Sequence, residues 1–264
     1  MTKILLTGAA GMLGKVLREQ LNGWKTTLRV SDIADLGPAR ENEEVALCDL
    51  ADMDAVQKLV EGCDGIIHLG GVSTENTFEN ILNANIRGTY NIYEAARKAG
   101  VPRILFASSN HTIGFHERET RLDANAPMRP DSLYGVSKCF GESLSRYYYD
   151  KFAIETACVR IGSSFPKPLN RRMLATWLSF DDLTALVKQI FEADRLGHAI
   201  VYGVSANKEQ WWDNHLTTYI GWSPKDSSEQ FENDEEFTSE VVDRNDPAVR
   251  YQGGGFAAAG HFED

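Results

Sequence analysis

The first residues of the chain combine a short apolar run with three evenly spaced glycines. The run Lys3-Ile-Leu-Leu-Thr7 is typical of a buried parallel strand, and Gly8, Gly11 and Gly14 follow it directly. Beyond Gly14, apolar residues recur at helical spacing as far as Leu21. A strand, a glycine turn and a helix N-terminus form an anion cradle, because the missing side chains let a pyrophosphate approach backbone N–H groups. The pattern therefore predicts a dinucleotide site, although a glycine turn without a ligand would show the same variant spacing.

Two acids at predicted strand ends extend this interpretation. The predicted strand 27–32 ends about twenty residues beyond the glycine turn, where a carboxylate can bind the ribose hydroxyls of a dinucleotide. Such a carboxylate repels a 2′-phosphate, and no arginine follows Asp32, so NAD is favoured over NADP. A third strand over residues 44–50 would bring Asp49 close to an adenine amino group. Asp32 could also be an ordinary acid at a strand end.

Strand and helix patterns alternate through the following part of the chain. Helices are predicted at residues 54–60, 81–99 and 134–152, and the strands that alternate with them at residues 65–71, 103–108 and 156–161. Alternation of this length predicts a parallel sheet with right-handed crossovers. We therefore expect an α/β fold with a doubly wound parallel Rossmann sheet over residues 1–162. Residues 163–264 should form a small C-terminal substrate lobe, of which 181–206 returns to the core sheet.

The predicted strand ends also suggest where a ligand binds. In doubly wound sheets the ligand lies beyond the carboxyl ends of the strands. Gly8, Asp32, Asp49, Gly71 and Ser109 all follow or end a predicted strand. We expect these residues to meet at one shared site.

Tyr134 and Lys138 are the candidate catalytic pair, with Ser109 upstream. They are four residues apart and share one face of the predicted helix. A tyrosine has a pKa of about 10, but a nearby ammonium and the positive nicotinamide of an oxidised cofactor favour the phenolate and lower that pKa. Tyr134 would then act as a general base, while Ser109 hydrogen-bonds the substrate oxygen that loses its proton. The alternative is a tyrosine that caps a surface helix beside a solvated lysine.

These motifs together resemble the extended-type short-chain dehydrogenase/reductases. The glycine turn, Asp32, Asp49-Leu50, Asn85 and the Ser109/Tyr134/Lys138 triad match that family position by position. The resemblance implies NAD as cofactor and implies the residues that contact it: Gly8, Gly11, Met12, Leu13, Gly14, Asp32, Asp49, Leu50, Leu69, Gly70, Gly71, Asn85, Tyr134, Lys138 and Ser164.

Within that family the chain is similar to the bacterial uronate dehydrogenases. The similarity lies in residues 106–114, 129–142, 159–163, 172–177, 211–214 and 250–254. It implies NAD-dependent oxidation of galacturonate or glucuronate at C1 to an aldarolactone, with no preference between the two sugars indicated. It also implies the substrate contacts Ser73, Ser109, Asn110, His111, Ser163 and Arg172.

A uronate carboxylate needs a cation in a dry pocket, and a planar guanidinium can bind it with two hydrogen bonds. Arg171 and Arg172 are adjacent, and the sequence alone does not say which of them points inward. A pair of arginines in a loop is also commonly solvated, and His111 could be a structural hydrogen-bonding residue.

The amino-acid composition argues against several classes of binding partner. The net charge is −11, and residues 226–246 hold nine acids and one arginine, which argues against nucleic acid or an anionic membrane as partner. The four cysteines have no metal-ligand or redox spacing, so we expect no metal site and reduced thiols in a cytoplasmic protein. We expect no signal peptide, because residues 3–7 already belong to the predicted fold, and no apolar run approaches the ~20 residues of a membrane span. The family resemblance implies a homo-oligomer.

Two other functions use similar motifs. A nucleotide-sugar epimerase or dehydratase shares the triad but retains its NAD between turnovers. Such relatives usually carry an Asn-x-Tyr-Gly-Pro-like stretch after the arginine of the sixth strand, whereas Ile-Gly-Ser-Ser-Phe-Pro follows Arg160 here. A non-catalytic NAD(H) sensor commonly lacks the tyrosine or the lysine, and this chain keeps both.

Overall fold

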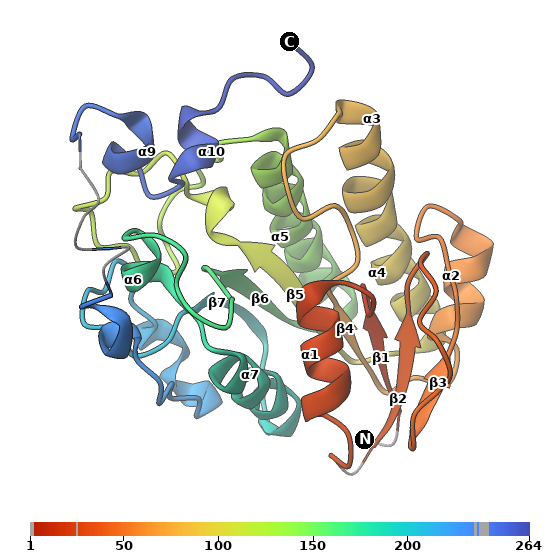
Figure 1. The fold of residues 1–264 in the computed structure, drawn as a ribbon. Helices are drawn as coiled ribbons and strands as arrows, with labels where there is room; N and C mark the ends of the chain where they lie inside the picture. Colours follow the sequence, from red (N-terminus) through yellow and green to blue (C-terminus); the bar gives the residue numbers. More distant parts are fainter. Residues whose placement is uncertain (1–2, 25, 235–236, 238–242) are drawn as a thin grey trace. The chain divides into compact units, whose positions relative to one another are not determined.

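The structure is a computed structural model that describes residues 3–24, 26–234, 237 and 243–264. Its centre is a parallel sheet of seven strands in the order β3-β2-β1-β4-β5-β6-β7, flanked by helices (Figure 1). This is the α/β Rossmann-type fold expected from the alternating patterns. The strands are β1 (Lys3–Thr7), β2 (Thr27–Ser31), β3 (Glu43–Val45), β4 (Gly65–His68), β5 (Arg103–Ser109), β6 (Glu155–Ile161) and β7 (His198–Gly203).

The helices follow the strands in the expected alternation, with shorter ones toward the C-terminus. They are α1 (Met12–Gln20), α2 (Met53–Val60), α3 (Phe78–Asn80), a π-helical turn (Ile81–Arg87), α4 (Gly88–Ala99), α5 (Leu133–Phe152), α6 (Met173–Thr176), α7 (Phe180–Glu192), α9 (Pro247–Arg250) and α10 (Gly255–Ala258). Short 3-10 turns span Asn110–Thr112, His215–Ile220 and Ser228–Phe231. Among the described helices, none is both long and apolar enough to cross a membrane.

The chain forms two compact units, each of which is described separately below. Unit 1 comprises residues 1–107, 140–158 and 195–199, and unit 2 comprises residues 108–139, 159–194 and 200–264. The division runs through β5, α5, β6 and β7. The predicted boundary after residue 162 remains a prediction.

Unit 1 has a core on one side of β1, β4 and β5. Leu5, Ile66 and Ile104 from these strands pack with Val56 of α2 and Ile92 of α4. Since neighbouring side chains of a strand point to opposite sides, the buried residues on either side of Leu5 point away from this core. Figure 1 draws α1 on that other side. Apolar runs buried on both sides explain why these strands could be predicted from sequence.

The strand expected over residues 44–50 is shorter than its apolar pattern. β3 ends at Val45, although the N–H groups of Ala46 and Cys48 still donate to Val30 and Asp32 carbonyls at 3.0 and 3.1 Å. β3 lies at the edge of the sheet, so the chain beyond it follows β2 without a further strand on its outer side. Asp49 therefore lies in a loop.

Unit 2 has a smaller core built largely from aromatic residues. Tyr202, Trp211 and Trp212 pack with Ile113 and Leu122, and the Tyr202 and Trp212 rings stack with centroids 5.4 Å apart. The two tryptophans are buried in this core. The acidic segment 226–246 lies partly outside the described residues.

Candidate active site

The glycine turn after β1 forms a cradle that side chains would fill. Gly8 has φ +72° and lies so close to the end of β4 that a Cβ atom there would come within 2.8 Å of the Gly70 nitrogen. A Cβ atom on Gly14 would overlap the Gly8 carbonyl oxygen. The first turn of α1 begins after Gly11 and has no side-chain cap, so its N–H groups can bind a phosphate. The turn therefore fits the pyrophosphate of a dinucleotide.

Asp32 connects the end of β2 to this cradle. Its Oδ2 accepts a hydrogen bond from the Ala10 N–H at 2.9 Å, and its Oδ1 accepts one from the Ala34 N–H at 3.1 Å. Each carboxylate oxygen keeps a second lone pair for a ribose hydroxyl. Asp49 is exposed, and its Oδ1 accepts a hydrogen bond from the Ala51 N–H at 2.9 Å.

Asn85 holds the chain that follows β4. Its side chain accepts a hydrogen bond from the Val72 N–H at 2.7 Å and donates one to the Val72 carbonyl at 3.0 Å. A Cβ atom on Gly71 would come within 2.7 Å of the Asn85 Oδ1. Asn85 belongs to the π-helical turn, a form often found at functional sites. Ser73, the predicted substrate contact in unit 1, is exposed just beyond this clamp.

Unit 1 thus contains most of the predicted cofactor residues. They come from the glycine turn, the ends of β2 and β4, the loop after β3 and the π-helical turn: Gly8, Gly11, Met12, Leu13, Gly14, Asp32, Asp49, Leu50, Leu69, Gly70, Gly71 and Asn85. Tyr134, Lys138 and Ser164 belong to unit 2.

The predicted triad comes together within unit 2. Ser109 ends β5, and its side chain is hydrogen-bonded to Tyr134 in the first turn of α5. The Lys138 Nζ atom lies 5.5 Å from the centre of the Tyr134 ring. Gly135 permits this start of α5, because a Cβ atom there would overlap the His111 carbonyl. All three side chains are buried.

Burial acts on both titratable groups of the triad. It raises the pKa of Tyr134 to about 12, an effect that the Ser109 hydrogen bond reduces and the Asp131 charge reinforces. Burial also lowers the pKa of Lys138 to about 8. The sequence predicts a lowered tyrosine pKa with cofactor bound, whereas in the chain alone desolvation of the phenolate dominates. In the chain alone, burial therefore favours the neutral phenol of Tyr134.

Arg172 lies among the predicted substrate contacts of unit 2. Its Nε donates to the Gln252 carbonyl at 2.8 Å, and its Nη1 donates to the Ser163 hydroxyl at 3.4 Å. The Asn110 amide, oriented so that its donor and acceptor both find partners, accepts from the Arg172 Nη2 at 2.8 Å and donates to the Ile161 carbonyl at 3.1 Å. These contacts fix the plane of the guanidinium.

The charge of this guanidinium has no direct counterion among the described residues. No described carboxylate lies within 4.0 Å of it, and its contacts are to neutral oxygens. Part of the side chain is exposed, but the guanidinium is deep in the protein, and burial lowers the pKa of Arg172 to about 10. Arg172 thus stays cationic at neutral pH and is suited to an anionic ligand. Arg171 is exposed and donates to the Phe237 carbonyl at 3.4 Å.

Three further residues lie in this cluster, and no pattern in the sequence predicts a role for them. Asp131 is hydrogen-bonded to His111 at 2.8 Å, and the Phe256 ring stacks on His111 with centroids 3.9 Å apart. Gln252 is buried and binds Arg172 through its carbonyl. The segments that carry the family resemblance include Asp131 and Gln252, but nothing in their spacing joins them to residues so far away in the chain.

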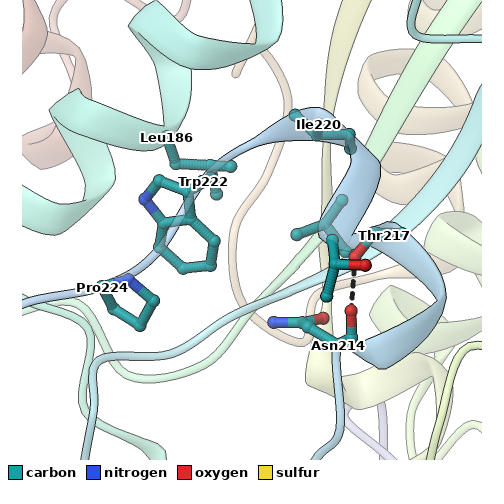
Figure 2. Close-up of a pocket in the computed structure, with 8 residues that line it drawn as sticks. Leu186, Asn214, Thr217, Ile220, Trp222 and Pro224 are labelled. Carbon is teal, nitrogen blue, oxygen red and sulfur yellow. Dashed lines mark hydrogen bonds between the residues drawn. The ribbon is translucent and has the colours of Figure 1, made fainter.

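A small pocket elsewhere in unit 2 contains none of the predicted site residues. Its volume is about 100 Å³, and Figure 2 shows Trp222, Pro224, Leu186 and Ile220 around it. The Thr217 hydroxyl on its wall donates to the Asn214 carbonyl at 3.1 Å. The lining is mostly apolar and offers no titratable side chain, so it is not a candidate catalytic site.

Comparisons with known proteins show the family to which the chain belongs. Residues 4–179 match the model of the NAD dependent epimerase/dehydratase family. The chain is 55% identical to a uronate dehydrogenase of Pseudomonas syringae pv. tomato over 99% of this chain and 95% of that protein. A solved structure is the crystal structure of a glucuronic acid dehydrogenase from Chromohalobacter salexigens, whose sequence is 57% identical to this chain. The two structures superpose with a TM-score of 0.97 over 100% of this chain and 99% of that chain.

A second solved structure is of a uronate dehydrogenase mutant from Agrobacterium tumefaciens, complexed with NAD. It is 53% identical to this chain, with a TM-score of 0.96 over 99% of both chains.

Proposed function

Because the chain belongs to the NAD dependent epimerase/dehydratase family, and within it to the uronate dehydrogenases, we propose that it oxidises a hexuronic acid at C1 with NAD. The observation that carries the proposal is the guanidinium of Arg172, held by neutral groups without a direct counterion among the described residues. A substrate carboxylate supplies the missing charge and can form two parallel hydrogen bonds with a guanidinium. A neutral sugar offers no carboxylate, and a nucleotide sugar has no free C1 hydroxyl to oxidise, because its C1 oxygen is bonded to phosphate.

The proposed reaction removes a proton and a hydride from the cyclic sugar acid. Tyr134, as phenolate, takes the proton of the C1 hydroxyl, while Ser109 hydrogen-bonds the same oxygen. Bound NAD supplies the acceptor for the hydride that leaves C1. The C1–O bond becomes a carbonyl, so the product is an aldarolactone, which opens in water to the aldaric acid. Lys138 holds positive charge beside the Tyr134 ring and favours the phenolate.

Substrate binding is assigned to residues that meet in unit 2 and to one residue of unit 1. Arg172 would bind the carboxylate, and the remaining contacts would bind hydroxyls of the sugar: Ser73, Asn110, His111 and Ser163. The cofactor residues named above would hold NAD through the glycine turn and the ribose contact of Asp32.

The proposal is tested by following NADH absorbance with purified protein. The panel contains galacturonate, glucuronate, the matching neutral sugars and nucleotide sugars carrying the same rings. Rapid NADH formation with a free uronate is the expected result. Protein that arrives with tightly bound NAD and acts only on nucleotide sugars would instead identify an epimerase or dehydratase.

Asp32 should set the cofactor preference. Asp32→Ala is expected to weaken NAD binding about ten- to a hundredfold, because a hydrogen bond to a charged group is lost, and to narrow the gap to NADP. Asp32→Asn is the matched control for the glycine turn: its amide oxygen can still accept from the Ala10 N–H while the charge is gone. Dissociation constants of NAD and NADP, measured for each protein, test this expectation. Equal use of NAD and NADP by the unmutated protein would contradict the role of Asp32 in cofactor preference.

The pH dependence should follow the phenolate of Tyr134. Since burial raises the pKa of Tyr134 to about 12, the reactive form grows as pH increases, and kcat/KM for the uronate should rise from neutral toward alkaline pH. Burial lowers the pKa of Lys138 to about 8, so its ammonium is present at neutral pH and lost above about pH 8. Lys138→Met should therefore lower kcat/KM at neutral pH and have little effect well above pH 8. Profiles of kcat/KM against pH for both proteins check this, and identical profiles would remove Lys138 from the assigned role.

A further inference from the structure

The carboxylate of Asp131 is buried and closely held. One oxygen, Oδ2, is 2.8 Å from the Nδ1 of His111, and the other, Oδ1, accepts a hydrogen bond from the Ser132 hydroxyl at 2.9 Å. A Cβ atom on either Gly114 or Gly253 would overlap Oδ2. None of the Asp131 side chain is exposed. The absence of side chains at these two glycines therefore leaves the space that this carboxylate occupies.

This contact determines which ring nitrogen of His111 carries a proton. A carboxylate only accepts hydrogen bonds, so Nδ1 must be the donor. In the neutral imidazole, Nε2 then has a lone pair and is an acceptor. The ring is held on one side by stacking with Phe256 and lies edge-on to Tyr134 at 5.8 Å between centroids. A flipped ring would leave a buried carboxylate without this partner.

The Nε2 of His111 is directed to no protein partner in the described part of the chain. The side chain of His111 keeps 13% of its surface exposed, whereas its Nδ1 is bonded to Asp131. His111 follows Asn110, which binds Arg172, and lies beside Tyr134. A ring in this place, with a fixed acceptor and no protein donor for it, suits a hydroxyl group of a sugar.

We propose that Asp131 is a positioning residue that holds the His111 ring with Nε2 as an acceptor for a hydroxyl of the uronate. This inference rests on the proposed function, because His111 would touch the substrate and Asp131 would act only through His111. The hydroxyl donates its hydrogen to Nε2, and no bond is made or broken.

The variant Asp131→Asn tests the inference with little change of shape. The new amide can donate to Nδ1, which selects the tautomer with a hydrogen on Nε2 and converts the acceptor into a donor. KM for the uronate should rise about ten- to a hundredfold, the effect of an unmet hydrogen bond, while kcat and NAD affinity change little. Asp123→Asn removes the same charge from a partly exposed turn, where its carboxylate accepts from the Asn125 N–H at 2.8 Å, and should leave KM unchanged.

A double-mutant cycle separates positioning from a general structural role. His111→Ala should raise KM by an amount similar to Asp131→Asn. The double variant should be no worse than His111→Ala alone, because Asp131 then has nothing to position. Losses that add in the double variant, or a normal KM for Asp131→Asn, would overturn the proposal.

Nitrogen NMR of the histidine rings in the unmutated protein does not depend on the folding of any variant. The expected signal for His111 has a protonated Nδ1 and an unprotonated Nε2, and the opposite pattern would refute the assignment. Failure of the unmutated protein to form NADH with any uronate would overturn the proposed function and the substrate contact together. In that case the NMR pattern still decides whether Asp131 sets the tautomer.

Discussion

Replacing Tyr134 with phenylalanine should leave a folded protein that binds NAD but has lost about 100- to 10,000-fold of its turnover, the usual effect of removing a general base. The substitution removes only the hydroxyl that is bonded to Ser109 and keeps the buried ring beside His111 and Lys138. Steady-state kcat with galacturonate and glucuronate, measured beside NAD affinity and melting temperature, checks the expectation.

Ser109→Ala is the matched control for this experiment. It removes the hydroxyl group bonded to Tyr134 and leaves the base in place, so its loss of turnover should be smaller than that of Tyr134→Phe. Because the Ser109 hydrogen bond lowers the pKa of Tyr134, the rise of activity with pH should also move to higher pH in Ser109→Ala. Normal turnover in Tyr134→Phe would show that another group takes the proton.

The fold was predictable because its signals are local. β1 ends where the apolar run meets Gly8, and the strand, turn and helix patterns that follow lie within a few residues of their predicted places. β3 is the exception. It lies at the edge of the sheet, where a strand has hydrogen bonds to one neighbour only, and the apolar pattern of the sequence continues beyond the end of the strand. The π-helical turn before α4 gives no sequence signal that differs from an ordinary helix.

The electrostatics of the site were less predictable. A sequence shows that Tyr134 and Lys138 share a helix face, but it does not show that both are buried. Burial moves the pKa of Tyr134 up and that of Lys138 down, so each group is pushed toward its neutral form. Self-association remains a prediction, since it requires a second copy of the chain.

The choice between the two adjacent arginines depends on residues far away in the chain. Gly254, eighty-two positions beyond Arg172, has φ +64°, and a Cβ atom there would come within 2.7 Å of the Arg172 Cδ. Neighbouring Gln252 supplies the carbonyl that the Nε of Arg172 binds. No local pattern in the loop predicts this contact, whereas Arg171 is left at the surface.

Arg172→Ala should therefore raise KM for galacturonate and glucuronate sharply while NAD affinity changes little. A charged hydrogen bond lost from a dry site is worth about 1.5–3 kcal/mol, or roughly ten- to a hundredfold or more in affinity. Arg172→Lys keeps a charge but not the planar fork, so its loss should be intermediate. Arg171→Ala removes a charge one position away and should leave uronate kinetics unchanged.

Neutral galactose separates the carboxylate from the rest of the sugar. It should be a poor substrate for the unmutated enzyme, because the buried guanidinium then keeps no anionic partner, and Arg172→Ala should affect it much less than galacturonate. If Arg172→Ala slowed both sugars equally, loss of the contacts to Ser163, Asn110 and Gln252 would explain the effect better than loss of a carboxylate contact. Galactose as good as galacturonate would leave an NAD-dependent sugar dehydrogenase whose specificity lies elsewhere.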